Sequence, residues 1–263
     1  MSLRLLVTGA GGRMAQVLLP QLRRRYGPMT LLARSAVEDA DADDRVQLAD
    51  VADLDAVIAA AAGADAILHL AGIADEAPYE KILASNIVGA YNVFEAARRT
   101  GVRRVVFASS NHVTGFYRCG ERIGVEDAVR PDTHYGASKV YGEALGQLYH
   151  DKFGLEVVSL RIGSFRAVPD DHRQLSTWLS HRDGLDLIVR SLETPGVGHL
   201  VVYGVSANTR AWWRLGPEAE ALGYAPRDDA ERFAAQLDGP HPDDSDLRQG
   251  GIYVEPGYGG GYW

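Results

Sequence analysis

The chain has 263 residues, of which 46% are hydrophobic and 24% are charged, and its formal net charge is −8. These are the values of an ordinary globular protein, and they exclude a disordered, collagen-like or coiled-coil chain. Because an acidic chain repels phosphate backbones, nucleic acid is not an expected partner.

The apolar runs and the cysteine content exclude further classes. No run approaches the ~18 apolar residues of a membrane-spanning helix, and the short apolar start of the chain lacks the layout of a signal peptide. Cys119 is the single cysteine, so an internal disulfide framework and a cysteine-based zinc site are excluded. We therefore expect a cytoplasmic protein without a metal site or a membrane contact.

Short aliphatic runs alternate with segments of helical periodicity along the first part of the chain. The runs predict strands at residues 3–7, 31–33, 66–70, 104–109 and 156–161, and a further extended stretch ends near residue 48. The periodic segments predict helices at residues 14–25, from Asp53 onward, at 79–100 and at 135–152. Strands joined by helices of this length form right-handed crossovers, so we predict an α/β fold with a Rossmann-type, doubly wound parallel sheet.

The pattern becomes less regular after Arg161, where one further strand is predicted at residues 200–203. We predict one compact domain, in which residues 1–163 form a dinucleotide-binding Rossmann core and residues 164–263 a small substrate-binding C-terminal region. The glycine- and tyrosine-rich stretch at 257–263 has the composition of a flexible end.

A glycine-rich turn lies where the first predicted strand becomes the first helix. It reads Thr8-Gly9-Ala10-Gly11-Gly12-Arg13-Met14-Ala15. Glycine lets the backbone approach a pyrophosphate closely, and the start of a helix supplies free N–H groups. An ordinary turn between a strand and a helix can have the same composition, but this position favours NAD, bound by Gly9, Gly12, Arg13 and Met14.

An NAD site usually has an acidic residue at the end of the second strand, where it binds the ribose hydroxyls. Here that place reads Leu32-Ala33-Arg34-Ser35, without an acid. Arg34 fits the 2′-phosphate of NADP and equally well fits a solvated arginine, so we expect NAD with some tolerance of NADP. Asp50, followed by Val51, ends the third extended stretch and suits the adenine amino group.

Tyr135 and Lys139 are four positions apart and therefore share one face of a predicted helix. An ammonium nearby favours the phenolate and lowers the tyrosine pKa from about 10, so the pair can accept a proton. Ser110 follows a predicted strand, at the end where doubly wound folds bind their ligands. Such pairs are common by chance, but the order of glycine turn, serine and tyrosine–lysine pair favours a dehydrogenase site.

The order of these motifs resembles the extended short-chain dehydrogenase/reductase family over nearly the whole chain. The shared motifs are Thr8-Gly9-x-x-Gly12-x-x-Ala15, Leu70-Ala71-Gly72, Asn86, Ser109-Ser110 and Tyr135-x-x-x-Lys139. Further stretches look like those of bacterial uronate dehydrogenases, namely Ser109-Ser110-Asn111-His112-x-x-Gly115, Arg161-Ile162-Gly163-Ser164, Leu175-Ser176-Thr177-Trp178 and Ala207-Asn208-x-x-x-Trp212-Trp213. Those enzymes use NAD to oxidise C1 of glucuronate or galacturonate to an aldarolactone.

The resemblance implies a role for each matching residue. The implied catalytic residues are the base Tyr135, its tuner Lys139, the hydroxyl-positioning Ser110 and the proton-relay residue Asn86. The implied cofactor contacts also include Val51, Leu70, Ala71, Gly72, Asn86, Tyr135, Lys139 and Ile162. The implied sugar-acid contacts are Ser110, Asn111, His112, Tyr135, Ser164 and Arg173. Two positions depart from the uronate enzymes: their ribose-binding aspartate is Ala33 here, and one of their sugar-binding serines is Ala74.

Arg173 is also the best carboxylate ligand on chemical grounds, because a guanidinium fork can bind both oxygens of a carboxylate. It lies in a polar segment after the predicted strand that ends at Arg161. A salt bridge to Asp170 or Asp171 is the alternative, and Arg161 is the rival ligand. Trp212 and Trp213 fit either a sugar-binding face or the core.

We therefore predict an NAD-dependent dehydrogenase of hexuronic acids. Two other functions stay open: a nucleotide-sugar epimerase or dehydratase, for which the C-terminal part is short, and a non-catalytic dinucleotide sensor. By analogy with the family, the helices at 79–100 and 135–152 pair between subunits, so we expect a homo-oligomer.

Overall fold

The computed structural model describes residues 3–237 and 247–261, and its main feature is a parallel sheet of seven strands. The strand order is β3-β2-β1-β4-β5-β6-β9. This order and the flanking helices confirm the predicted Rossmann-type sheet. The strands are β1 (Leu5–Thr8), β2 (Thr30–Ala33), β3 (Arg45–Leu48), β4 (Ala66–His69), β5 (Arg104–Ser110), β6 (Glu156–Ile162) and β9 (His199–Gly204). A small separate sheet pairs β7 (Ser164–Phe165) with β8 (Trp178–Leu179).

Helices α2 and α4 show how capping residues set the helix ends. Asp53 accepts a hydrogen bond from the Ala56 N–H at the start of α2, and Gly101 ends α4 in the left-handed conformation. The α-helices are α1 (Arg13–Tyr26), α2 (Leu54–Ala61), α3 (Tyr79–Ile82), α4 (Gly89–Thr100), α5 (His134–Phe153), α6 (Gln174–Thr177), α7 (His181–Glu193) and α8 (Pro217–Leu222).

The predicted helix at 79–100 differs from the expectation in one respect. A π-helical turn, Leu83–Val88, separates α3 from α4. Such turns accommodate an extra residue in a helix, and they are frequent at functional sites. Asn86 lies within this turn and is buried. The chain also forms short 3₁₀ helices at Asn111–Thr114, Ala230–Gln236 and Gly251–Val254.

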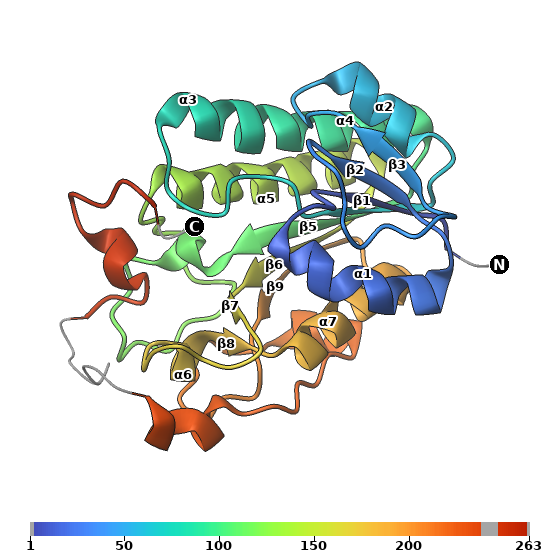
Figure 1. Ribbon diagram of the computed structural model, residues 1–263. Coiled ribbons are helices and arrows are strands. Elements are labelled where there is room, and N and C mark those ends of the chain that lie inside the picture. Colours follow the sequence, from blue (N-terminus) through green and yellow to red (C-terminus); the bar gives the residue numbers. More distant parts are fainter. Residues whose placement is uncertain (1–2, 238–246, 262–263) are drawn as a thin grey trace.

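Helices cover both faces of the sheet (Figure 1), and alternate residues of the strands pack against the helices on opposite faces. On one face, Leu5 and Val7 of β1 belong to a core with residues of α1 and α7. On the other face, Leu6 belongs to a core with residues of α2, α4 and α5. Strands covered on both faces require nearly continuous apolar runs, which is why these runs could be recognised in the sequence.

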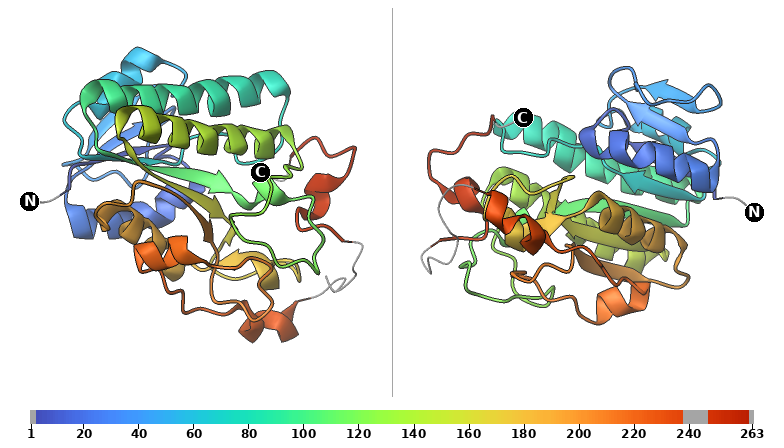
Figure 2. Two further views of the ribbon diagram at one scale, coloured as in Figure 1. Left: turned by 180° about the vertical axis from the view of Figure 1, so that it is seen from behind. Right: turned by 60° about the horizontal axis from the view of Figure 1, so that its bottom comes forward.

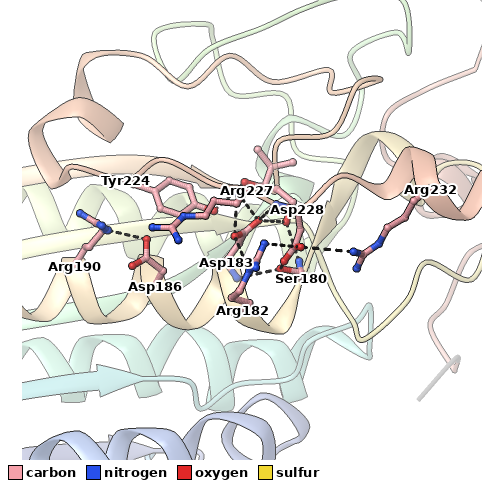
Figure 3. A network of polar contacts seen from close by, with 11 residues as sticks. Ser180, Arg182, Asp183, Asp186, Arg190, Tyr224, Arg227, Asp228 and Arg232 are labelled. Atoms are coloured by element: carbon pink, nitrogen blue, oxygen red, sulfur yellow. Dashed lines mark hydrogen bonds and ion pairs between the residues drawn. The ribbon is translucent and has the colours of Figure 1, made fainter.

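A buried polar network holds part of the C-terminal region to the start of α7 (Figure 3). The Asp183 carboxylate accepts hydrogen bonds from the Ser206 hydroxyl at 2.7 Å and from the Asp228 N–H at 3.0 Å. Ser180 donates to Asp228 at 2.6 Å and caps the start of α7. The network fixes the loops after β9 beside α7. The division of the chain into a cofactor-binding and a substrate-binding part stays a prediction.

Neither a membrane-spanning helix nor a metal-binding cluster is present among the described residues. Within 3–237 and 247–261, no helix is long and apolar enough to cross a membrane. The same part of the chain contains no group of three or more metal-binding side chains.

Candidate active site

The strand order reverses between β1 and β4, and doubly wound folds bind their ligands at this point, beyond the carboxyl ends of the strands. The glycine turn lies here, between β1 and α1. Gly9 has a φ of +72°, and a Cβ on it would lie 2.5 Å from the Ala71 backbone nitrogen. Gly12 caps α1 without a side-chain hydrogen bond, so the first N–H groups of the helix are available to an anion. The turn therefore fits a dinucleotide pyrophosphate.

A cavity beside this turn fits the adenosine half of a dinucleotide. Its lining residues are Gly9, Gly11, Gly12, Leu32, Ala33, Arg34, Ser35, Ala49, Asp50, Val51, Leu70, Ala71, Gly72 and Ser85. The predicted residues Arg34, Asp50 and Val51 are thus brought together, as are Leu70 to Gly72. Arg13 and Met14 line a neighbouring cavity with Phe165 and His181. No carboxylate lies at the end of β2, where Ala33 and Arg34 line the wall.

Tyr135 and Lys139 are buried on α5, beside the end of β5. The Lys139 ammonium lies 5.7 Å from the centre of the Tyr135 ring and donates a hydrogen bond to the Ala108 carbonyl at 2.8 Å. Burial lowers the pKa of Lys139 to about 8. Burial also raises the pKa of Tyr135, whereas a hydrogen bond with Ser110 lowers it. The expected effect of Lys139 on the phenol stays a prediction.

Asn86 connects the cofactor loop to α5. Its Oδ1 accepts from the Ile73 N–H at 2.8 Å, and its Nδ2 donates to the Ile73 carbonyl and the Ser138 hydroxyl, each at 3.0 Å. A Cβ on Gly72 would lie 3.1 Å from this Oδ1 and 3.7 Å from the Lys139 nitrogen. Asn86, Gly72 and Lys139 therefore lie beside one another, while their roles in a catalytic site stay a prediction.

Arg161 is held in a buried ion pair and does not face a ligand. Its Nε and Nη2 donate to the two oxygens of Glu143 at 3.0 and 2.9 Å. The Ser109 hydroxyl donates to the same carboxylate at 2.6 Å. Both side chains of the ion pair are less than a tenth exposed. The expectation that Arg161 rivals Arg173 as the carboxylate ligand is therefore wrong, because the Arg161 guanidinium already has a bidentate partner.

We expect Glu143→Met to reduce the free energy of unfolding by ~3–5 kcal/mol, because it leaves Arg161 buried without a counter-charge. Urea denaturation measures this loss. The double variant Glu143→Met, Arg161→Met is the control: it removes both charges and is expected to lose much less stability than the single variant. A loss below about 1 kcal/mol in the single variant would contradict the importance of the pair.

The predicted sugar-binding residues His112 and Ser110 contact Tyr135, and Asn111 joins them to Arg173. The ring of His112 lies 5.9 Å from that of Tyr135, and its Nδ1 is 2.7 Å from the buried Asp132 carboxylate. With its amide oriented to satisfy both neighbours, Asn111 donates to the Ile162 carbonyl and accepts from Arg173 Nη2, each at 3.0 Å. The Ser164 hydroxyl lies 2.9 Å from that of Thr177.

Burial lowers the pKa of Arg173, so this cation is poorly hydrated. The expected alternative of a salt bridge is not observed. Asp170 pairs with Arg166 at 2.9 Å, and Asp171 accepts from the Gln174 N–H at 2.8 Å. The Arg173 Nε instead donates to the Gln249 carbonyl at 2.7 Å. The guanidinium is therefore suited to an incoming carboxylate.

The structure decides two sequence-based expectations, one about the aromatic residues and one about the C-terminal residues. Trp212 and Trp213 belong to a core cluster with Tyr203 and thus do not form a sugar-binding face. The expectation of a flexible end is wrong for the described residues up to Gly261, because Tyr258 donates to Asp75 at 2.6 Å and the Gly261 N–H to the same carboxylate. Residues 262 and 263 lie outside the described residues.

The sequence did not reveal the residues that support site residues through hydrogen bonds or ion pairs, namely Asp132, Glu143 and Gln249. Each acts on a residue that is distant in the sequence: Asp132 and His112 are 20 positions apart, and Gln249 and Arg173 are 76 apart. Spacing on one helix or strand cannot reveal such pairs. No motif marks them in a single sequence.

A doubly wound sheet with a glycine turn at its switch point, and a buried tyrosine and lysine one helical turn apart beside it, defines a nicotinamide-dependent oxidoreductase of the short-chain type. Residues 5–194 match the model of the NAD dependent epimerase/dehydratase family. The chain belongs to this family, and within it to the group of the uronate dehydrogenases.

Three relatives illustrate this grouping. A uronate dehydrogenase from Pseudomonas syringae is 47% identical, over 97% of this chain and 94% of the relative. A crystal structure of a mutant uronate dehydrogenase from Agrobacterium tumefaciens, complexed with NAD, has a TM-score of 0.91 and 42% identity, covering 97% of each chain. A glucuronic acid dehydrogenase from Chromohalobacter salexigens has the same TM-score and coverage at 41% identity.

Proposed function

We propose that this chain oxidises the C1 hydroxyl of a hexuronic acid, glucuronate or galacturonate, to the aldarolactone with NAD. The observation that carries the proposal is the partly desolvated Arg173 guanidinium, which donates a hydrogen bond to Asn111. The residue after Asn111 is His112, and its ring lies 5.9 Å from that of the buried Tyr135. The hydrogen-bond partners of this guanidinium, the Gln249 carbonyl and the Asn111 amide, are neutral, so a substrate carboxylate would be its charged hydrogen-bond partner. The chain's similarity to named uronate dehydrogenases supports the same substrate class over an epimerase or a dinucleotide sensor.

In this proposal, Tyr135 accepts the proton of the C1 hydroxyl. Bound NAD supplies the nicotinamide that takes the hydride from C1. Ser110 hydrogen-bonds the reacting oxygen, and its contact with the Tyr135 phenol favours the phenolate. Lys139 and Asn86 lie behind the tyrosine and carry the proton onward. Loss of hydride from C1 and of the hydroxyl proton leaves a C1 carbonyl, which is that of the lactone.

A second group of residues binds the sugar acid in this proposal. Arg173 binds the carboxylate, because its fork can engage both oxygens. Asn111, Ser164 and the His112 ring bind sugar hydroxyls. Asp132 occupies His112 Nδ1, so Nε2 is the ring nitrogen that faces the substrate.

The decisive experiment mixes the purified chain with NAD and each uronate and follows the absorbance of NADH. We expect turnover with at least one of glucuronate and galacturonate, and formation of the corresponding lactone by NMR. Glucose serves as the control substrate that lacks the carboxylate. The absence of turnover with both uronates would refute the proposed function.

The adenosine cavity predicts unusual tolerance of NADP. Because no acid stands at the end of β2, the 2′-phosphate of NADP meets no carboxylate at that position. For the same reason, the ribose of NAD lacks a hydrogen bond that is worth about tenfold to a hundredfold in affinity. We expect Ala33→Asp to tighten NADH binding by that factor and to abolish NADPH binding. Fluorescence titration of the two reduced cofactors measures both effects.

The contribution of Arg34 is tested in the same titration. Arg34→Ala should weaken NADPH and leave NADH unchanged. Arg24→Ala is the matched control, because Arg24 is an exposed arginine near the end of α1 that does not line the cavity. Strict specificity of the wild-type chain for NADH would show that Arg34 points away from the ribose.

The proposal includes a homo-oligomer in the cytoplasm, where the reaction draws on a pool of free dinucleotide. Figure 2 shows α4 and α5 side by side on one face of the molecule. Tyr79, Tyr91, Leu148 and Phe153 of α3, α4 and α5 are more than a third exposed. A second copy would cover these side chains. Light scattering measures the mass of the assembly, and a monomer would contradict this part of the proposal.

A further inference from the structure

The 3₁₀ turn Gly251–Val254, together with the preceding residues 249 and 250, lies against the sugar-binding residues, although it is far from them in the sequence. We call residues 249–254 the C-terminal turn. Figure 1 shows it, in red, beside the carboxyl end of β5. None of its residues was expected to belong to the site.

The C-terminal turn is anchored by Gln249, which is 1% exposed. The Trp213 indole donates to Gln249 Oε1 at 2.9 Å, and Gln249 Nε2 donates to the carbonyls of Arg118 and Glu121. The next residue, Gly250, donates its N–H to the Gly115 carbonyl at 2.9 Å. These bonds fix the backbone of the turn, including the Gln249 carbonyl.

That carbonyl accepts the hydrogen bond from Arg173 Nε at 2.7 Å. The guanidinium is thereby held at two points, since its Nη2 donates to Asn111. Gly251 leaves room for this arrangement: a Cβ on it would lie 2.9 Å from Arg173 Cδ and 3.1 Å from Nε. The backbone of Gly251 also has a φ of +61°, which favours glycine. The turn thus determines the position of the Arg173 side chain.

Tyr253 makes the corresponding contact with His112. The two rings stack with their centres 3.9 Å apart and an angle of 28° between their planes. The Tyr253 ring also packs against the Tyr258 ring, with their centres 4.6 Å apart. The Tyr258 hydroxyl donates a hydrogen bond to Asp75 in the loop after β4. His112 is therefore fixed by Asp132 through its Nδ1 and by Tyr253 through its ring face.

We propose that the C-terminal turn is part of the uronate site: the Gln249 carbonyl positions Arg173 for the substrate carboxylate, and Tyr253 forms a wall of the sugar pocket and positions His112. This inference rests on the proposed function and assigns specificity-determining residues to it. It predicts that substitutions in the C-terminal turn weaken the binding of the sugar acid and leave NADH binding unchanged, because the glycine turn that binds the cofactor lies between β1 and α1.

The first test is Gly251→Ala, which places a methyl group against Arg173. We expect the KM for glucuronate to rise at least about tenfold, which is the effect of losing one hydrogen bond to a charged group. The dissociation constant of NADH, measured by fluorescence, should stay within about twofold of wild type. Gly196→Ala is the matched control, because Gly196 also has a positive φ, of +66°, and a Cβ there meets nothing within 4 Å; its KM for glucuronate should stay at the wild-type value.

Tyr253 provides a second test that does not depend on backbone strain. Tyr253→Ala should raise the KM for glucuronate by about tenfold or more, whereas Tyr253→Phe keeps the stacked ring and should stay within about threefold of wild type. Thermal unfolding and NADH binding show whether each variant is folded.

The outcomes separate this inference from the proposed function. If the wild-type chain does not turn over either uronate, the proposed function fails. If it does, and folded Gly251→Ala and Tyr253→Ala variants keep the wild-type KM, the C-terminal turn is not part of the site. A variant with weakened NADH binding as well as a raised KM would also overturn the inference, because it would indicate a general structural role.

Discussion

Replacement of Tyr135 by phenylalanine is expected to lower kcat by about 10²–10⁴-fold, which is the usual loss when a general base is removed. The ring is kept, so the contact with His112 and the packing of α5 should be preserved. Burial raises the pKa of Tyr135, which means that the phenol is protonated at neutral pH and that the wild-type rate should increase with pH. This increase should disappear in the variant.

The measurement is the initial rate of NADH formation across a pH series, with thermal unfolding as the check on folding. Binding of NADH to Tyr135→Phe should be close to that of wild type. Ser138→Ala removes a neighbouring hydroxyl, which accepts a hydrogen bond from Asn86 and donates one to the Tyr135 carbonyl. It is the comparison variant on the same helix. A Tyr135→Phe rate within about threefold of wild type would remove Tyr135 from the mechanism.

Replacement of Arg173 by alanine is expected to cost about 2–5 kcal/mol in kcat/KM for a uronate, because the substrate carboxylate loses its partner in a desolvated site. This corresponds to a loss of roughly 30-fold to several thousand-fold. The corresponding neutral aldose should lose far less, since it has no carboxylate for the guanidinium. Steady-state kinetics with the acid and the neutral sugar measure the difference.

The comparison of the two substrates is the internal control for this variant. Removal of Arg173 also leaves the Gln249 carbonyl and the Asn111 amide without a donor, and this structural cost applies to both sugars. Equal losses for acid and neutral sugar would therefore mean that Arg173 only supports the loop. A larger loss for the acid identifies the carboxylate as its ligand.

The sequence predicted the fold because the signals for the fold are local. Strands buried on both faces require aliphatic runs, and amphipathic helices such as α1 require apolar residues at helical spacing. The glycine turn and the pair Tyr135 and Lys139 are also short, contiguous motifs. Their order along the chain suffices to bring them together, because parallel strands place their carboxyl ends at one edge of the sheet.

The sequence by itself thus determined the sheet and the glycine turn, and its motifs indicated the proposed proton acceptor and the proposed sugar-acid residues. Only the tertiary structure decided which arginine is available to a substrate carboxylate. Arg161 is neutralised by Glu143, whereas the hydrogen-bond partners of Arg173 are neutral groups. It also decided that the end of the chain packs on His112. The physical reason is that these contacts join segments distant in the sequence. Their partners are chosen by packing, which no spacing in a single sequence encodes.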